Sequence, residues 1–547
     1  MKSKNIIIVI LLAGLFAPAC KKNFIAINTD PEHLDSATIN YKYLFTAAEL
    51  ITSGNSDANA YEDWRNNLIY GSTMLQHLSS TQSYWNGDKY TYNAGYNSAY
   101  WEQNYTSPVQ NITEVIYHTK TDTGLTNFYN IARIFRVFMF QRITDMYGDC
   151  PYSEAGLGFI TKNVTPVYDK QQDIYTNMFS ELQDAASKLN AGEPNTVGAA
   201  DVVFGGDVGE WKKFAYSEML RLAMRLVNVD PATAQSMASA AVSGGVMTSI
   251  SDNAVYTHQD FTQGQVTVDG TGLVLDGVDA DASRVSEFFI NMLKSTSDPR
   301  LTYIATVASD PTDLSNLGDT TSAIQLGQPN GYDNNGGATD IRNAPNWPKI
   351  PNDPNSDSLT VYQNRYSIVN RNTYARLDAP TFFLTYAETA LLEAEAAYRG
   401  WISGDPATFY TAGVTAAMDQ FGQMSSLESA TSATPATYPP IPAGAIAAYL
   451  AANPYSSGTA LEQINTQYWI TTFLDEYEAF ANWRRSGFPT LTPVNNYIGN
   501  VTNGTIPRRF TYSVSEQTAN AVNYQAAASR MTGGDKMTSR VWWDVAP

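Results

Sequence analysis

Residues 125–151 read LTNFYNIARIFRVFMFQRITDMYGDCP, and this stretch decides the class of fold. Its large apolar side chains recur every three or four residues, at Ile131, Ile134, Phe135, Phe138 and Met139. That spacing places them along one face of an α-helix. A Gly-Asp pair at 148–149 and a proline at 151 then end the periodic pattern. We therefore predict a buried helix over 125–147.

The same periodicity recurs on both sides of this helix. Apolar stripes predict helices over 40–51, 109–118, 171–189, 210–227 and 232–242, and later over 379–401, 406–421, 445–452 and 460–485. Consecutive helices joined by short turns indicate helix pairs, although no strict repeat length is visible. The chain is therefore predicted to be mainly α-helical. Its 547 residues indicate two domains or one elongated helical assembly with inserted loops.

The middle of the chain has a different composition. Between about 248 and 374 the residues Gly, Asp, Asn, Pro and Thr dominate, and helical periodicity is lost. The segment 266–270, Val-Thr-Val-Asp-Gly, is typical of a hairpin arm and its turn. We therefore predict a loop-rich insert with short strands between two helical parts.

The N-terminus has the pattern of an export signal. Lys2 and Lys4 precede an apolar run over 6–16, which ends in small residues and Cys20. The run is shorter than the roughly 20 apolar residues that span a bilayer. A cysteine at the cut is typical of bacterial lipoproteins, in which acyl chains on that residue anchor the protein to a membrane. The alternative is a cysteine that lies by chance near an ordinary cleavage site.

Composition excludes some functions and one kind of covalent stabilisation. The formal net charge of −19 argues against a nucleic-acid partner, because phosphate contacts need concentrated Lys and Arg. If Cys20 carries lipid, Cys150 is the one cysteine left, so no intramolecular disulfide can form. The 34 tyrosines and 10 tryptophans provide apolar faces with hydrogen-bonding edges, which suit surfaces that meet polyhydroxylated ligands or proteins.

Four separated segments together resemble one known family. They read FQRITDMYGDCPYSEA at 140–155, WKKF at 211–214 with RLAMR at 221–225, FLTYAE at 383–388 with EAEA at 393–396, and WRRSGFP at 483–489. In this order they resemble the SusD/RagB family of nutrient-binding outer-membrane lipoproteins of Bacteroidota. The resemblance implies a SusD-like fold, mainly α, in which tetratricopeptide-like helix pairs support a loop-rich region with short strands.

The resemblance also implies a domain organisation and a function. Residues 1–19 would be a lipoprotein signal peptide, 20–39 a lipidated tether beginning at Cys20, and 40–547 a single SusD-like domain with its insert at about 248–374. The protein would be lipid-anchored in the outer membrane and face outside. There it would bind a glycan or another nutrient and work with a SusC-like TonB-dependent transporter, without being an enzyme.

Charged residues in these segments are predicted to hold the scaffold. Arg484 and Arg485 are placed to cap helix carbonyls or to pair with carboxylates. Glu388, Glu393 and Glu395 lie on a helix rich in small residues, where buried or half-buried carboxylates are expected to pair with such arginines.

Two loops with aromatic and amide side chains are predicted to bind the ligand. An aromatic ring can cover the apolar face of a sugar while neighbouring polar groups meet its hydroxyls. The first set comprises Tyr84, Trp85, Asn86, Asp88 and Tyr90, with Trp85 as the first choice. The second set, in the insert, comprises Tyr332, Asn334 and Trp347. The alternative is that these aromatics pack the loops.

Motifs for catalysis, cofactors and metals are not visible. The four histidines have no zinc-helix spacing, and no nucleophile elbow or phosphate-binding glycine loop is present. The stretch Asp333 to Gly336 lacks the ligands of an EF-hand, and Asp276, Asp279 and Asp281 fit a solvated acidic loop better than a calcium site. We therefore expect no cofactor and no metal. Two alternatives stay open, namely an extracellular glycoside hydrolase, which needs only two carboxylates placed in space, and an adhesive or structural surface lipoprotein.

Overall fold

The computed structural model describes residues 40–55, 61–260, 267–308, 317–349, 363–431, 438–494 and 497–545. Residues Lys42–Pro547 form one compact unit, and Met1–Tyr41 form another, of which only Asn40 and Tyr41 are described. The predicted signal peptide 1–19, the tether 20–39 and Cys20 therefore lie outside the described residues. No helix among the described residues is long and apolar enough to cross a membrane.

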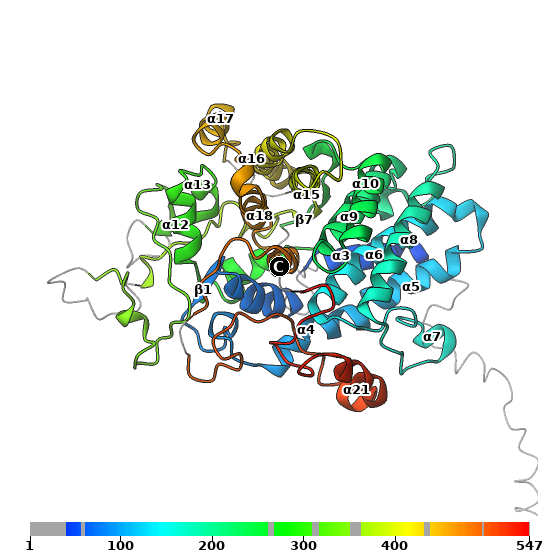
Figure 1. Ribbon diagram of the computed structural model, residues 1–547, viewed down its shortest axis with the longest axis horizontal. Helices are drawn as coiled ribbons and strands as arrows, with labels where there is room; N and C mark the ends of the chain where they lie inside the picture. The colour runs from blue at the N-terminus through cyan, green and yellow to red at the C-terminus, as the bar shows by residue number, and fades with distance from the viewer. Residues whose placement is uncertain are drawn as a thin grey trace, which may run out of the picture. The chain divides into compact units, whose positions relative to one another are not determined.

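Helices dominate the first half of the described chain. They are α3 (Tyr41–Thr52), α4 (Ala94–Thr106), α5 (Pro108–Thr119), α6 (Thr126–Tyr147), α8 (Gln171–Lys188), α9 (Val208–Arg225) and α10 (Pro231–Gly244). Successive members pack against each other, α5 on α6, α6 on α8, α8 on α9 and α9 on α10 (Figure 1). The helix predicted over 125–147 is α6, and almost all of its 22 residues are buried. It is the central element of this half.

A second group of helices follows the insert. It comprises α15 (Tyr386–Tyr398), α16 (Pro406–Thr431), α17 (Ala443–Ala452), α18 (Ala460–Thr471) and α19 (Glu476–Ser486). Helix α15 packs closely on α16, because small residues line it and Gly413 lies opposite. A Cβ atom at Gly413 would lie 2.8 Å from Leu391 and 3.1 Å from the Ala387 carbonyl. The predicted small-residue stripe on this helix therefore does bring a neighbouring helix close.

The insert contains short antiparallel strands. Two two-stranded sheets pair β1 (Leu78–Ser80) with β3 (Ser283–Val285) and β2 (Ala254–Tyr256) with β7 (Thr381–Leu384). A third sheet has the order β5 (Leu317–Asp319), β4 (Ala305–Ala308), β6 (Ile368–Val369). Between them lie the short helices α11 (Gly270–Leu273), α12 (Glu287–Ser295) and α13 (Leu301–Ile304). The β2–β7 pair brings the two ends of the insert together, and the β1–β3 pair holds the loop after β1 against the insert.

Several sequence predictions about element bounds were wrong. The helix predicted over 379–401 begins only at Tyr386, because 381–384 form strand β7 and Thr385 caps the helix in a capping box with Glu388. The helix predicted over 460–485 is two helices, which separate where Leu474 adopts a φ of 70°. The predicted hairpin turn at 269–270 instead starts α11, where Asp269 accepts a hydrogen bond from the Gly272 amide at 2.6 Å.

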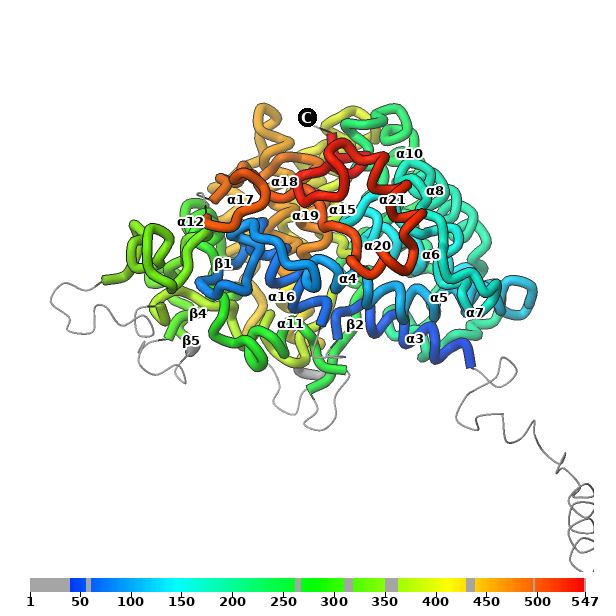
Figure 2. Tube along the Cα trace, turned by 90° about the horizontal axis from the view of Figure 1, so that it is seen from below, coloured from blue at the N-terminus to red at the C-terminus, as the bar shows by residue number. Residues whose placement is uncertain are grey.

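Two further features were not predicted. A π-helix, η2 (Asp63–Ser72), precedes β1, and its residues are largely buried. At the other end of the chain are α20 (Glu516–Ala519) and α21 (Ala521–Arg530), drawn in orange and red in Figure 2, and Ser513 just before them donates to Glu102 of α4 at 2.8 Å. From the last residues, the Trp543 indole donates to the Asp145 carboxylate of α6 at 2.8 Å. The C-terminal segment therefore contributes to the same core as the first helices.

The four segments that carry the family resemblance meet in one buried ionic network. Arg221 donates to Glu388 at 2.8 Å, and Arg225 bonds both Asp145, at 3.2 Å, and Glu478. Arg485 binds Glu395 through two hydrogen bonds of 2.8 and 2.9 Å.

The last member of the network is Arg484, which donates to the backbone carbonyls of Phe480, Asp145 and Arg508. The predicted pairing is confirmed for Glu388 and Glu395 but not for Glu393, which has no arginine partner among the described residues.

Candidate functional site

The loop after β1 is fixed by one carboxylate of the insert. Asp279 accepts hydrogen bonds from the Trp85 indole at 2.8 Å, the Trp64 indole at 3.0 Å and the Tyr84 hydroxyl at 2.6 Å. Burial and the neighbouring Asp279 carboxylate raise the pKa of Tyr84. Three aromatic side chains from two separate segments are thus gathered around one acceptor.

Burial corrects the prediction that Trp85 is exposed in this loop. The exposed fraction of Trp85 is 0%, whereas that of Tyr84 is 36%. A Cβ atom at Gly87 would lie 2.5 Å from the Tyr70 carbonyl and 2.6 Å from that of Ile69, so the loop lies directly on η2. The close approach and the hydrogen bond to Asp279 leave the Trp85 ring no open face, and Tyr84 is the residue that reaches the surface.

The other three predicted residues of this loop are also buried. Asn86 donates to Thr91 at 2.6 Å, and Asp88 pairs with Lys89 at 2.8 Å with both side chains fully enclosed. The Tyr90 hydroxyl accepts a hydrogen bond from the Val494 amide at 3.1 Å. These contacts hold the loop in place.

The second predicted set lies half-buried in the insert. Tyr332 and Trp347 pack against a small cluster formed by Ile341, Ala344 and Tyr366, and Asn334 is also half-buried. The structure therefore brings the two predicted aromatics together.

Tyr497 connects the two predicted loops. Its hydroxyl donates to the Asp333 carboxylate at 2.8 Å, and its ring centroid lies 5.9 Å from the Lys89 ammonium. Asp333 is next to Tyr332, and Lys89 lies within the first loop, so Tyr497 stands between the two predicted sets. Ile498, which follows it, is 90% exposed.

Sequence reasoning missed a cluster of aromatics at the start of η2. The Arg65 guanidinium lies 3.9 Å from the Tyr61 ring centroid, 5.0 Å from that of Trp64 and 5.5 Å from that of Tyr96. All four side chains are half-buried, and burial lowers the pKa of Arg65. The signal in the sequence is the spacing of Tyr61 and Trp64, which puts both rings on one side of a helical turn in an otherwise polar stretch.

We call Tyr61, Trp64, Arg65, Tyr84, Tyr96 and Asp279 the aromatic cluster. It offers partly open ring faces flanked by a guanidinium and a carboxylate. Such an arrangement suits a ligand with an apolar face and hydroxyl edges, as a sugar ring has.

The acidic loop near the cluster is held by an arginine. Asp276 pairs with Arg371 at 2.8 Å, and Asp281 lies 3.9 Å from the same guanidinium. Asp279 faces the aromatics instead. Among the described residues no group of three or more His, Cys, Asp and Glu side chains could hold a metal ion.

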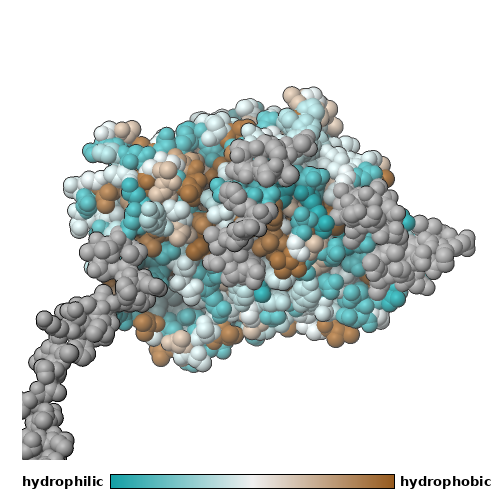
Figure 3. Space-filling model, turned by 180° about the vertical axis from the view of Figure 1, so that it is seen from behind, coloured by the Kyte–Doolittle hydropathy of each residue, from teal (hydrophilic) through white to brown (hydrophobic). Residues whose placement is uncertain are grey.

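Apolar side chains elsewhere on the surface are dispersed. On the face turned away from the viewer of Figure 1, the described residues show small separate apolar groups among hydrophilic ones (Figure 3). Any recognition on the visible part of this face would therefore involve mixed polar and apolar contacts.

Comparison with known proteins identifies the family. The sequence model of a family described as "Starch-binding associating with outer membrane" matches residues 39–513. This chain belongs to the SusD-like family. The family associates with the outer membrane and consists of binding proteins without catalytic activity. The predicted family and the predicted mainly helical SusD-like fold are both confirmed.

Solved structures of other SusD-like proteins superpose over most of the chain. One, described as a chitin-binding protein, is 32% identical with a TM-score of 0.77, and the match covers 93% of this chain and 100% of that one. A second, described as Bacteroidetes AC2a SusD-like, is 29% identical with a TM-score of 0.78 and the same coverage.

A third structure, of a chitin-binding SusD homolog from Flavobacterium johnsoniae, is more distant. It is 22% identical with a TM-score of 0.71, and the match covers 93% of this chain and 99% of that one, which shows the shared fold. No curated protein is significantly similar to this SusD-like protein in sequence.

Proposed function

We propose that this SusD-like protein binds oligosaccharides at the cell surface and passes them to a SusC-like TonB-dependent transporter. The observation that carries the proposal is the aromatic cluster, in which Asp279 and Arg65 hold four rings at the surface. A sugar would stack on the half-open rings, and its hydroxyls would bond to the charged groups beside them.

Within this proposal the predicted loop residues have different tasks. Tyr84 of the first loop and Tyr332, Asn334 and Trp347 of the insert are open enough to touch a ligand. Trp85, Asn86, Asp88 and Tyr90 are positioning residues, because each is buried and makes a hydrogen bond or ion pair within the protein.

Chitin fragments are the first ligands to test. The relative that is 32% identical is described as a chitin-binding protein, and a second, more distant structure is also described as chitin-binding. N-acetylglucosamine units present an apolar ring face together with amide and hydroxyl groups, which matches rings bordered by Arg65 and Asp279.

A binding experiment tests the function directly. Purified protein should be retarded in gels that contain soluble chitin derivatives, and chitohexaose should compete, whereas maltohexaose measures the preference among glycans. Arg65→Ala should weaken retardation, and Tyr117→Ala, at an exposed tyrosine of α5, is the matched control. Absence of retardation by every glycan would contradict the proposal.

The same experiment separates binding from hydrolysis and adhesion. Release of reducing ends from chitohexaose would favour a glycoside hydrolase. A surface adhesin would show no saturable oligosaccharide binding and no co-purifying transporter. Isolation of the protein from membranes with a large β-barrel protein would support the proposed SusC-like partner.

A lipid on Cys20 is the proposed means of attachment to the outer membrane. The cysteine follows a short apolar run and small residues, as in bacterial lipoprotein signals. Two or more acyl chains would give stable anchoring. The acyl anchor would keep the binding site next to the transporter.

A further inference from the structure

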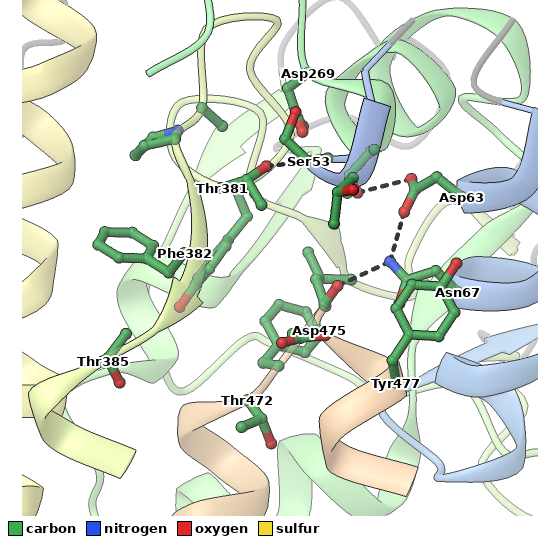
Figure 4. Close-up of a pocket in the computed structure, with 18 of the residues that line it drawn as sticks. Ser53, Asp63, Asn67, Asp269, Thr381, Phe382, Thr385, Thr472, Asp475 and Tyr477 are labelled. Atoms are coloured by element: carbon green, nitrogen blue, oxygen red, sulfur yellow. Dashed lines mark hydrogen bonds between the residues drawn. The ribbon is translucent and has the colours of Figure 1, made fainter. Parts of the chain in front are cut away.

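A partly open cavity of about 100 Å³ is lined by residues other than those of the aromatic cluster. It is bordered by the end of α3, the start of η2, strand β7 and the turn between α18 and α19. Figure 4 shows Asp63, Asn67 and Tyr477 on one side, Thr381 and Phe382 on the other, with Asp475 projecting between them. Hydroxyl and carboxyl groups thus face the cavity.

Carboxyl groups outnumber basic groups in the lining of this cavity. Glu62, Asp63 and Asp475 line it together with one arginine, Arg142, which bonds Asp475 at 2.7 Å. Asp63 accepts only neutral donors, Asn67 at 2.8 Å and Thr271 at 2.9 Å, and Glu62 accepts the Tyr477 hydroxyl. The two other lining carboxylates have partners of their own, since Glu388 bonds Arg221 and Asp269 caps α11.

Burial is the main cause of the raised pKa values of these carboxyl groups. Burial raises the pKa of Glu62 to about 8, with Asp63 adding to the effect. Burial likewise raises the pKa of Asp63 to about 7 and that of Asp475 to about 6. A cation inside the cavity would favour their ionised forms.

Three buried polar atoms of the lining have no hydrogen-bond partner. Two are acceptors, Oδ1 of Asp475 and Oε1 of Gln420, and one is a donor, Nε of Arg142. Gln420 lies on α16 and is 8% exposed. A buried polar group without a partner costs roughly 1–3 kcal/mol, so a ligand that supplies the missing partners would be bound favourably.

We propose that this cavity binds a small protonated amine that also carries a hydroxyl group, that is, an amino alcohol. The ammonium group donates to Asp475 Oδ1 and Gln420 Oε1 and favours the ionised forms of the lining carboxyl groups. The hydroxyl oxygen accepts from Arg142 Nε. A metal ion fits less well, because no group of three or more His, Cys, Asp and Glu side chains able to hold one occurs in the described part of the chain.

Ethanolamine is the probe, because it carries both groups and stays protonated at neutral pH. Thermal unfolding of the whole protein should shift to higher temperature with rising ethanolamine hydrochloride, beyond the shift given by NaCl at equal ionic strength. Ethylene glycol, which replaces the amine by a second hydroxyl, should give no such shift. Titration calorimetry then measures the dissociation constant.

Three variants decide whether the effect belongs to the cavity. Gln420→Leu removes one acceptor and Asp475→Asn removes a charge, and each should weaken ethanolamine binding at least about tenfold, as expected for a hydrogen bond to a charged group. Gln235→Leu, at an exposed glutamine of α10, is the matched control and should bind as the parent protein does. Because Gln420 makes no hydrogen bond through Oε1, its replacement by leucine removes no hydrogen bond at that atom, and thermal unfolding of the ligand-free variant checks that it is folded.

The outcomes separate clearly. No shift beyond that of NaCl means that the cavity holds water only, and the proposal is overturned. Equal binding by the parent protein and both cavity variants places ethanolamine elsewhere, which also overturns it. The result is independent of oligosaccharide binding, since Tyr84→Ala should leave ethanolamine affinity unchanged.

Discussion

The indole of Trp85 donates a hydrogen bond to Asp279 across 2.8 Å, although 194 residues separate the two in the sequence. The bond ties the loop after β1 to the insert. The same carboxylate holds Trp64 and Tyr84. The arrangement of the aromatic cluster therefore depends on Asp279, an acidic residue that the pattern of aromatic residues in the sequence does not predict.

Replacing Asp279 should reduce both stability and ligand binding. In Asp279→Ala the enclosed Trp85 indole loses its acceptor, which we expect to cost about 1–3 kcal/mol in free energy of unfolding. Tyr84 and Trp64 also lose their common partner, so affinity for chitohexaose should fall. Urea unfolding and calorimetry measure the two effects.

Asp276→Ala, on the same loop, is the control for Asp279→Ala. Asp276 is exposed, and its ion-pair partner among the described residues is Arg371, so its replacement should change stability by about 1 kcal/mol or less. Equal effects of the two variants would show that Asp279 has no special role.

Trp85 and Tyr84 should respond to truncation in opposite ways. Trp85→Ala empties a fully enclosed site and should cost about 3–5 kcal/mol of stability. Tyr84→Ala removes a half-open ring and should change stability little, but should weaken chitohexaose binding at least about fivefold. Thermal unfolding and affinity electrophoresis, done on both variants, distinguish these results.

If Trp85→Ala bound less well at unchanged stability, the indole would be a ligand contact after all. That outcome would require the loop to open on binding.

Two glutamates on α15 should show opposite pH effects. Arg485 and Arg399 lower the pKa of Glu395 to about 2 despite its burial, whereas burial without such a partner raises the pKa of Glu393 to about 7. The stabilisation from Glu395 is complete above pH 4.5, its ordinary value, and is lost as pH falls toward 2. The stabilisation from protonated Glu393 is lost as pH rises from 4.5 through 7.

Glu395→Gln should therefore cost about 3–5 kcal/mol at pH 7, because it leaves the buried Arg485 unpaired. Glu393→Gln should be neutral at pH 5 and stabilising at pH 8. Urea unfolding at several pH values checks both signs. A loss of stability in Glu393→Gln at pH 8 would mean that its carboxylate has a partner in solution.

Cys20→Ala should release the protein from the membrane without unfolding it. The acyl chains would be missing, while the compact unit Lys42–Pro547 keeps all of its contacts. Fractionation of cells followed by mass spectrometry of the mature N-terminus measures the effect. Continued sedimentation of the variant with membranes would contradict lipid anchoring.

Helices and family were predictable because their signals are local. Apolar periodicity located α6, α8 and α9 within a few residues of their bounds. The family segments contain charged residues that were expected to pair. The structure shows such a pair in Arg485 and Glu395. The break between α18 and α19 was not predicted. Leu474 adopts a positive φ there, and a leucine in the sequence gives no indication of that conformation.

The candidate site was less predictable because its contacts are distant in sequence. Trp85 was expected to be exposed on account of its polar neighbours, but its acceptor lies in the insert. Trp64 and Arg65 were overlooked because they lie in a π-helix without a regular apolar stripe. The cavity is lined by residues from several segments between Thr52 and Tyr477. No single stretch of the sequence could therefore predict it.

The pairing of β2 with β7 means that the insert leaves and rejoins the helical frame at neighbouring points. A segment with closed ends can change in length at a small entropic cost. The insert can therefore differ in length without a change in the helical frame. A segment that replaced the insert would, however, need an acceptor equivalent to Asp279. Without it, Trp64, Tyr84 and Trp85 would lose their common hydrogen-bond partner.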